Sequence, residues 1–246
     1  MNARFYAPDA REPGSEIDLP DEEAQHLSRV LRLKPGDTLA VFNGRGDEFT
    51  AVVAAVTKSR VTARLGAHAT AKAELPIALT LAQAVLKGDK MDAVVRDAVM
   101  LGFVAVQPIV TARSEVSLAA LTRGDRHERW HRVAVSSAKQ CGRAVVPAIA
   151  PPIAFDGPTS LAHLPSPQFL LVEPGASSQV TTVAGVNGEA PAAATLVVGP
   201  EGGWAPEEVQ RCAGHAHPIG IGTLTLRADA AAAVAAAALL THWKLI

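Results

Sequence analysis

The chain has 246 residues and a formal net charge of −1, and 48% of its residues are hydrophobic and 19% charged. These values exclude a chain that is disordered throughout, and they suffice for one large domain or two small ones. No apolar run reaches the roughly 18 residues that span a bilayer, and the first residues lack the apolar core of a secretion signal. The two cysteines form no disulfide framework. We therefore expect a soluble, reduced, cytoplasmic protein with no membrane partner.

The N-terminal part has the pattern of a small β-rich unit. Its strand-like runs are separated by turn signals and cover 39–42, 49–53 and 61–65. A polar stretch at 67–74, just before Pro76, predicts a linker. The sequence therefore predicts two domains, 1–72 and 76–246.

The periodicity changes after Pro76. Between Gly88 and Gly102, apolar residues recur at i, i+3, i+4 and i+7 and predict a helix whose buried face is Met91, Val94, Val95 and Ala98. This helix lies between two strand-like runs, and a β-α-β unit implies a parallel sheet. A second helix is expected at about 128–140. The expected strands of the sheet are 77–82, 103–106, 169–172 and 194–198, with connections at 147–167 and 175–193.

Positive charge is concentrated in two islands, although the net charge is close to zero. Residues 24–72 carry eight basic and three acidic residues, and residues 123–143 carry six basic and two acidic residues. Either island alone is equally well explained as a solvated surface, whereas the two together favour a polyanionic partner.

A glycine-rich segment, 199–203, follows a predicted strand and precedes a helix start at Pro206. It therefore lies at the carboxyl end of a parallel strand, where open α/β sheets bind ligands. The segment matches neither phosphate-binding glycine pattern, and the carboxylate of Glu201 opposes a phosphate. It predicts a ligand without phosphate or with positive charge, and a tight structural turn is the equal alternative.

A second glycine-containing segment, 219–227, precedes an apolar helix that starts at Asp229. Gly220 and Gly222 allow a ligand to approach the backbone closely. Arg227 stands where the chain enters this helix, which is an unfavourable place for a cation without a partner. Two interpretations remain open: a functional arginine, or an ion pair with a nearby carboxylate such as Asp229.

Two further patterns are opposed by their surroundings. Residues 127–131 match the HExxH zinc signature, but arginines surround the match and repel Zn²⁺, and no obvious third ligand follows. We therefore expect no metal, and a helix face that contacts phosphates is the better interpretation. Cys141 has no specified histidine partner, and we expect it to be inert and buried.

Short motifs follow one another in a fixed order along nearly the whole chain, at 26–37, 42–46, 87–92, 101–102, 140–143, 199–203 and 226–227. In this order they resemble the ribosomal RNA small-subunit methyltransferase E (RsmE) family of the SPOUT superfamily. The first two motifs resemble its PUA-like RNA-binding barrel, and the others resemble its catalytic domain. The segment 199–203 matches the most specific motif of the family.

The resemblance implies an α/β fold, with a C-terminal SPOUT domain that contains a deep trefoil knot and a small N-terminal PUA-like β-barrel. It implies methyl transfer from S-adenosylmethionine (SAM) to N3 of a uridine in 16S ribosomal RNA, with the small ribosomal subunit as partner. It places SAM against the loops after Val172 and Val198 and around 219–226. The expected cofactor-binding residues are Leu171, Glu173, Gly199, Pro200, Glu201, Gly202, Gly203, Ile219, Gly222, Leu224 and Leu226.

The resemblance also suggests roles for charged residues. SAM carries a sulfonium and no phosphate, which accounts for Glu201. N3 lies on the Watson–Crick edge, so the uridine must be unpaired or flipped out. Arg227 is the expected catalytic residue, which would stabilise the uracil anion, and no base is identified. The expected RNA-binding residues are Arg29, Arg32, Lys34, Arg45, Arg129, Arg132 and Arg143.

The sequence departs from the family pattern at four positions. Met100 and Lys139 stand where the family usually has Glu, Asp229 replaces Glu, and Ala230 replaces Thr. Two alternatives to the implied activity remain: a SPOUT methyltransferase that acts on another RNA site, and a non-catalytic RNA-binding protein.

The C-terminal helix, 229–243, is rich in alanine and apolar on every side. Such a helix is normally buried all round, and one small domain seldom surrounds it completely. Together with the resemblance, this predicts a homodimer built on the catalytic domains, with burial within one subunit as the alternative.

Overall fold

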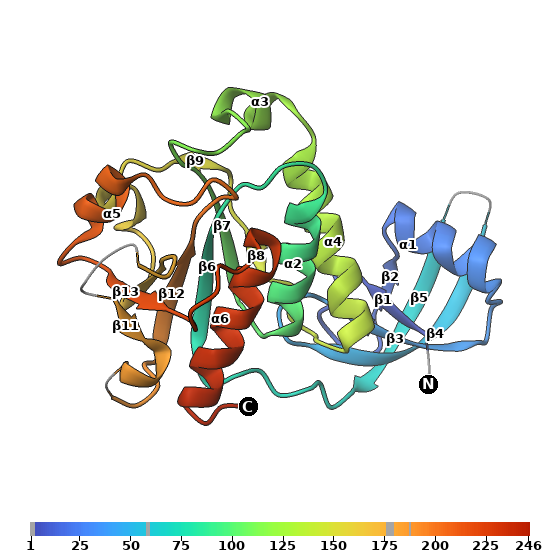
Figure 1. Ribbon diagram of the computed structural model, residues 1–246. Coiled ribbons are helices and arrows are strands. Elements are labelled where there is room, and N and C mark those ends of the chain that lie inside the picture. Colours follow the sequence, from blue (N-terminus) through green and yellow to red (C-terminus); the bar gives the residue numbers. More distant parts are fainter. Residues whose placement is uncertain (1–2, 58–59, 176–179, 187) are drawn as a thin grey trace. The chain divides into compact units, whose positions relative to one another are not determined.

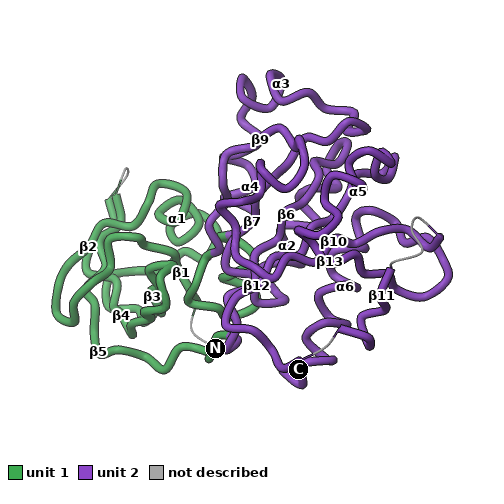
Figure 2. The backbone as a smooth tube through the Cα atoms, turned by 90° about the vertical axis from the view of Figure 1, so that its left-hand side faces the viewer, with its two compact units in different colours: residues 1–74, 135–146 green, residues 75–134, 147–246 purple. Residues whose placement is uncertain are grey.

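Figure 1 shows the computed structural model of the chain, which describes residues 3–57, 60–175, 180–186 and 188–246. The chain divides into two compact units (Figure 2). Residues 1–74 with 135–146 form unit 1, and residues 75–134 with 147–246 form unit 2. Helix α4 (Arg126–Cys141) contributes to both units. Its last part packs in unit 1, although the sequence pattern placed it with the C-terminal domain.

Unit 1 is built on a five-stranded sheet in the order β1-β3-β4-β5-β2. β3, β4 and β5 pair in antiparallel fashion, and the predicted turn after Phe42 joins the first two. Side chains alternate between buried and exposed along β4, so that one face forms a core with Phe5, Leu39 and Leu65. The strands are β1 Arg4–Tyr6, β2 Glu16–Asp18, β3 Thr38–Phe42, β4 Glu48–Val56 and β5 Val61–His68.

The connection between β2 and β3 is helical, which the sequence pattern did not reveal. α1 (Asp21–Gln25) continues directly into a π-helix, η1 (His26–Leu31), and Arg32 ends it in the left-handed conformation with φ 54°. Leu27 anchors η1 in the core, whereas Val30 is 67% exposed. The segment is thus held from one side and presents the other to solvent.

Arg4 holds segment 135–146 within unit 1. Its guanidinium donates to the carbonyl oxygens of Ala138 and Lys139 at 3.0 Å each, and to the carboxylate of Glu48 at 2.7 Å. The two carbonyls belong to the last turn of α4, where the helix dipole favours a cation. A single arginine therefore joins the end of α4 to the sheet.

Unit 2 contains an eight-stranded sheet in the order β11-β13-β10-β12-β6-β7-β8, with β9 also paired to β7. All its pairings are parallel, which confirms the predicted class of sheet. The expected strand at 103–106 begins two residues later, and β13 was not expected. The strands are β6 Ala78–Ala84, β7 Ala105–Val110, β8 Ala148–Ile149, β9 Ile153–Ala154, β10 Gln168–Leu171, β11 Thr181–Thr182, β12 Ala193–Val198 and β13 His217–Gly220.

The remaining helices of unit 2 lie around this sheet. α2 (Lys90–Met100) buries Met91, Val94, Val95 and Ala98, which confirms the predicted face. α2 and α6 (Ala228–His242) pack against each other, and α5 (Pro206–Cys212) lies on the opposite side of the sheet (Figure 1). The others are α3 Leu118–Arg123, η2 Pro158–Leu161 and η3 Val183–Gly185. In the described ranges, no helix has the length and hydrophobicity needed to cross a membrane.

α6 is buried on one face only. Ala231, Ala235 and Leu239 are buried, whereas Val234 on the opposite face is 38% exposed. The expectation that this apolar helix is covered on every side is therefore not met within a single chain. An alanine-rich, solvent-facing surface remains along the helix.

Candidate functional site

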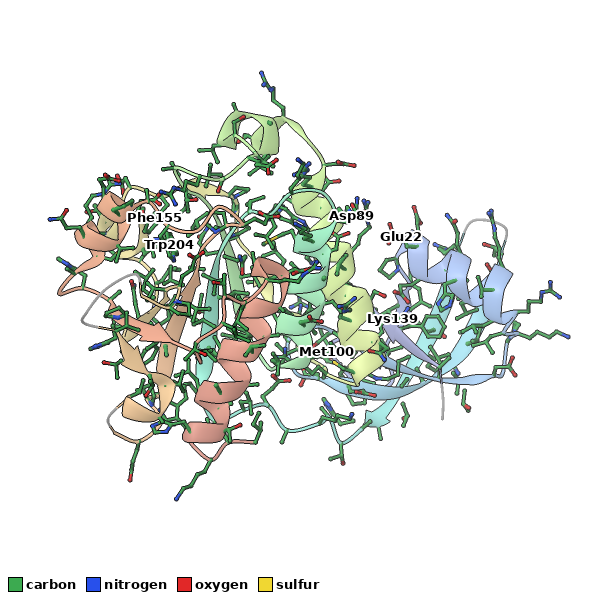
Figure 3. All side chains as sticks on the ribbon, in the orientation of Figure 1. Glu22, Asp89, Met100, Lys139, Phe155 and Trp204 are labelled. Carbon is green, nitrogen blue, oxygen red and sulfur yellow. The ribbon has the colours of Figure 1, made fainter. Side chains whose placement is uncertain are left out.

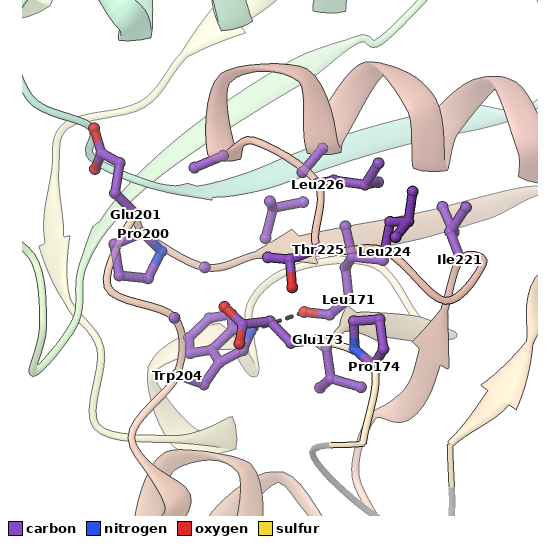
Figure 4. A pocket seen from close by; sticks show the side chains of 16 residues that line it. Leu171, Glu173, Pro174, Pro200, Glu201, Trp204, Ile221, Leu224, Thr225 and Leu226 are labelled. Carbon is purple, nitrogen blue, oxygen red and sulfur yellow. Dashed lines mark hydrogen bonds between the residues drawn. The ribbon is translucent and has the colours of Figure 1, made fainter.

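A pocket with an empty volume of about 570 Å³ lies at the carboxyl ends of β10, β12 and β13 (Figure 4). Three chain segments form it: the residues after β10, the glycine-rich segment after β12, and the segment between β13 and α6. This is the edge of a parallel sheet where ligands bind in open α/β folds. The lining residues are Leu171, Val172, Glu173, Pro174, Val198, Gly199, Pro200, Glu201, Gly203, Trp204, Ile221, Leu224, Thr225, Leu226, Ala228 and Ala231.

Two glycines of segment 199–203 are explained by their local geometry. A Cβ atom at Gly199 would lie 3.0 Å from the indole of Trp204, and one at Gly203 would lie 2.8 Å from Oε1 of Glu173. Gly203 also has φ +67°, a conformation that side-chain-bearing residues rarely adopt. Trp204 Nε1 donates to the carbonyl of Leu171 at 2.8 Å and so joins the loop to the end of β10.

Most of the residues expected from the sequence meet in this pocket. Leu171, Glu173, Gly199, Pro200, Glu201, Gly203, Leu224 and Leu226 line it. Gly202, Ile219 and Gly222 do not: Gly202 lies against Arg113, and Ile219 is fully buried in β13. The sequence pattern missed Trp204, although an aromatic residue directly after a glycine-rich loop is a usable signal for a pocket wall.

The role expected for Glu201 needs correction. Its Oε1 accepts from Lys90 Nζ at 2.9 Å and from the backbone N–H of Lys87 at 3.2 Å. Burial alone would raise the pKa of Glu201, but these hydrogen bonds outweigh it and hold the pKa below its usual range. Its charge is thus already paired with a cation, and its carboxylate points away from the centre of the pocket, whereas that of Glu173 lies beside Trp204 (Figure 4).

Arg227 forms an ion pair with Asp229. Nε and Nη2 of the arginine donate to the two carboxylate oxygens at 3.1 and 2.9 Å, and the arginine side chain is 78% exposed. This hydrogen-bonded pair raises the pKa of Arg227 and lowers that of Asp229. Of the two interpretations of Arg227, the ion pair with Asp229 is therefore present in the structure. Arg227 is not among the residues that line the pocket.

The HExxH match lies at the start of α4. Nε2 of His127 lies 2.8 Å from the carbonyl oxygen of Ile149, so this ring has a structural partner. Among the residues that the structure describes, no group of three or more His, Cys, Asp or Glu side chains could hold a metal ion. Cys141 is half-buried, with Sγ 3.8 Å from the carbonyl of Ala138.

The expected RNA-binding residues fall into two groups. Arg29, Arg32, Lys34 and Arg45 of unit 1 and Arg132 of unit 2 are exposed. Arg129 donates to Asp92 at 2.7 Å and to Asp89 at 2.9 Å. Arg143 is 7% exposed and its guanidinium binds Glu74, so it has a structural partner, and its contact with RNA stays a prediction.

Contacts or solvent exposure explain three of the four residues that depart from the family pattern. Lys139 donates to both carboxylate oxygens of Glu23 at 2.8–2.9 Å, so a buried acid requires a cation at this position. Met100 is 47% exposed, so its change faces solvent. Asp229 supplies the partner of Arg227.

Comparisons with known proteins agree with this architecture. A family model of the RNA methyltransferase domain matches residues 73–240, and one of the RNA methyltransferase PUA domain matches residues 19–66. The fold and the pocket thus define the class of RNA-methyltransferase α/β domains joined to a PUA domain.

Named relatives narrow the class. The Ribosomal RNA small subunit methyltransferase E of Synechocystis is 30% identical over 90% of this chain and 71% of that protein, and that of Bacillus subtilis is 26% identical over 92% and 90%. The crystal structure of the Neisseria gonorrhoeae protein of this name, bound to S-adenosyl methionine, superposes with a TM-score of 0.87 at 31% identity, covering 99% of this chain and 98% of that one. A Legionella pneumophila methyltransferase in complex with SAM gives 0.88 at 29%, covering 98% of both. The chain belongs to the ribosomal RNA small subunit methyltransferase E family.

Proposed function

We propose that this protein transfers the methyl group of SAM to N3 of a uridine in 16S ribosomal RNA, within the small ribosomal subunit and hence in the cytoplasm. The observation that carries the proposal is the pocket at the carboxyl edge of the unit 2 sheet. In this assignment residues 76–246 perform the transfer, and residues 1–72 hold the RNA.

The pocket suits SAM in the chemistry of its walls. Leu171, Trp204 and Leu226 supply apolar surface for the adenine, and the backbone of the glycine-rich loop supplies donors and acceptors at close range. Glu173 supplies a carboxylate for a ligand that carries a positive sulfonium, and this role replaces the one expected for Glu201. SAM supplies an electrophilic methyl group when bound, and the chain holds and orients it.

We further propose that the C-terminal segment forms a trefoil knot. The segment 221–227 lines the pocket together with the loops after β10 and β12. α6 then contacts β12 and also η3, which lies in the connection between β10 and β12. His242 Nε2 lies 2.8 Å from the carbonyl of Val186 in that same connection. These contacts favour a chain end that passes through the loop between the two strands.

Binding of SAM is tested by a variant that fills the pocket. Ala228 lines the pocket at the start of α6, whereas Ala230 is exposed and does not. We expect Ala228→Phe to abolish SAM binding in titration calorimetry and the matched Ala230→Phe to leave it within about twofold. Equal affinities in both variants would remove this pocket from the proposal.

The reaction is tested with labelled SAM and small subunits that lack the modification. Transfer of label into 3-methyluridine supports the proposal. Label in another nucleoside indicates a different RNA site, and SAM binding without any transfer indicates an RNA-binding protein without this activity.

We also propose a homodimer that buries the solvent-facing side of α6. Alanine side chains on that side let two backbones approach closely, and an exposed apolar helix face favours a partner. Light scattering at low micromolar concentration should give about twice the 25.5 kDa chain mass. Ala233→Glu and Ala237→Glu together should give monomers. A monomeric wild type contradicts the dimer, and a dimer unaffected by these changes contradicts the role of α6.

A further inference from the structure

A second, larger pocket adjoins the cofactor pocket. It has an empty volume of about 1250 Å³, and Glu173 and Trp204 line both pockets. A ligand in the second pocket would therefore lie next to a ligand in the first. Its lining residues are Arg113, Leu170, Glu173, Trp204, Pro206, Val209, Gln210, Cys212, Ala213, Gly214, Ala216 and Pro218.

Trp204 supplies a flat, anchored part of the wall between the two pockets. The indole of Trp204 is fixed by its hydrogen bond to Leu171 and by the ring of Phe155, whose centroid lies 5.2 Å away (Figure 3). Val209 and Cys212 of α5 add apolar surface to this pocket. The Cys212 thiol brings no charge to it, because burial raises the pKa of this thiol to about 11. A fixed aromatic ring with apolar surroundings is the common setting for an unstacked nucleobase.

Arg113 is built into this pocket with a defined position. Its Nη1 donates to the carbonyl of Gly202 at 3.0 Å. A Cβ atom at Gly202 would lie 3.2 Å from the Cβ of Arg113, so the two loops approach each other closely at this glycine. A guanidinium has five N–H donors, and among the described residues only this hydrogen bond is recorded for that of Arg113.

A buried carboxylate fixes the loops that carry Arg113 and Trp204. Glu208 is 1% exposed, and it accepts from the backbone N–H of Ala112 at 2.8 Å and from that of Ala205 at 2.9 Å. Each loop residue is adjacent in sequence to one of the pocket residues. Glu208 is therefore a positioning residue that sets the arginine and the indole relative to each other.

We propose, resting on the function proposed above, that this second pocket receives the target uracil, with Arg113 and Glu173 as catalytic residues. The uracil edge presents an N3–H donor between two carbonyl acceptors. A guanidinium donor and a carboxylate acceptor complement this edge, and cytosine, which lacks a proton on N3, does not fit it.

The transfer then balances as follows. The N3 proton moves to the carboxylate of Glu173, and Arg113 stabilises the charge that develops on a uracil oxygen. N3 attacks the methyl carbon of SAM, the carbon–sulfur bond breaks, and its electron pair stays on sulfur. The proton leaves Glu173 to solvent, because this side chain is exposed. The products are methylated uridine, S-adenosylhomocysteine and one proton.

The role of Glu173 is tested by single-turnover methyl transfer with Glu173→Gln across pH 6–9. Without a base, the reaction requires uracil that is already ionised. We expect a rate about 100-fold or more below wild type that rises about tenfold per pH unit. Because Glu173 also lines the cofactor pocket, SAM affinity is measured separately and the rates are compared at saturating SAM. A variant with the wild-type pH profile would overturn the assignment.

Arg113 and the pocket itself are tested by matched pairs. Arg113→Ala should lower the single-turnover rate at least tenfold, whereas Arg211→Ala, an exposed arginine on α5 outside the pocket, should not. Ala213→Trp should block the second pocket while SAM affinity is retained, and His215→Trp is its exposed control. Full activity of both Arg113→Ala and Ala213→Trp would overturn the proposal. Absence of transfer by the wild-type protein would instead overturn the function on which it rests.

Discussion

Two sets of basic residues, one from each basic island, look alike in the sequence. The first set is Arg29, Arg32 and Lys34 of unit 1, and the second is Arg129, Lys139 and Arg143. In the structure the first three are exposed, and no ion pair is recorded for them among the described residues. The other three each contact at least one carboxylate. A basic side chain that is not already neutralised is better placed to bind a phosphate, so we expect these two sets of residues to differ in their contribution to RNA binding.

The difference arises from what each segment packs against. In unit 1, Asp18 and Glu16 of β2 pair with Arg60 and Arg64, at 3.4 and 2.7 Å. Among the described residues, they do not pair with the basic residues at the end of η1 and in the turn that follows it. In the second island, Arg129 in the first part of α4 pairs with Asp92 of α2, and Lys139 in its last part pairs with Glu23 of α1. Arg143, two residues after α4 ends, pairs with Glu74. Three of the six basic residues of the second island are thus paired with carboxylates, whereas Arg123 and Arg132 are exposed and have no recorded ion pair among the described residues.

The largest effect is expected at Lys139. Its partner Glu23 has a side chain only 9% exposed, so Lys139→Glu would place two carboxylates together in a poorly solvated site. We expect a loss of about 4 kcal/mol in the free energy of unfolding, measured by urea denaturation. The double variant Glu23→Lys, Lys139→Glu should recover a large part of the loss. If the single variant is as stable as wild type, the ion pair is not structural.

Arg143→Ala should also destabilise the protein. The guanidinium is buried, but Glu74 is 30% exposed and is hydrated when its partner is lost. We therefore expect a smaller loss, about 2 kcal/mol, with no change in the salt dependence of RNA binding. A flattened salt dependence would instead return Arg143 to the RNA-binding set.

These pairings show where prediction from the sequence stops. The spacing of Met91, Val94 and Val95 reveals the buried face of α2, because burial follows helical periodicity over a few residues. The partner of Lys139 is 116 residues away, and no local pattern encodes that contact. β13 escaped prediction for a different reason, since His217, Pro218 and Gly220 break its apolar run.

The same limit applies to the candidate site. The glycine-rich loop is visible in the sequence because the close approach of Trp204 favours a glycine at 199 and a positive φ favours one at 203. Its place after a strand locates it at the sheet edge. The neutralisation of Glu201 by Lys90 joins residues 111 positions apart, so the sequence could not reveal it. Residues fixed by local geometry were found, and those fixed by long-range pairing were not.

The exposed island should dominate RNA binding. Replacing Arg29, Arg32 and Lys34 with Ala should reduce the slope of log affinity against log salt by about two to three, because each lost phosphate contact retains about one counterion. SAM affinity and the free energy of unfolding should stay unchanged, since these side chains are exposed. A salt slope equal to that of wild type would show that this island is only a solvated surface.

The smallest effect compares two arginines of one helix. Arg129 is held by Asp89 and Asp92, which raise its pKa, whereas exposed Arg132 has no recorded ion pair among the described residues. If α4 contacts RNA, Arg132→Ala should reduce the salt slope by about one. Arg129→Ala should reduce it by less than half of that, because its guanidinium must leave two carboxylates before it binds a phosphate. Equal reductions of the salt slope in the two variants would show that the ion pairs of Arg129 open freely when RNA binds. Pairing with nearby carboxylates would then not explain any difference in RNA binding between the two islands.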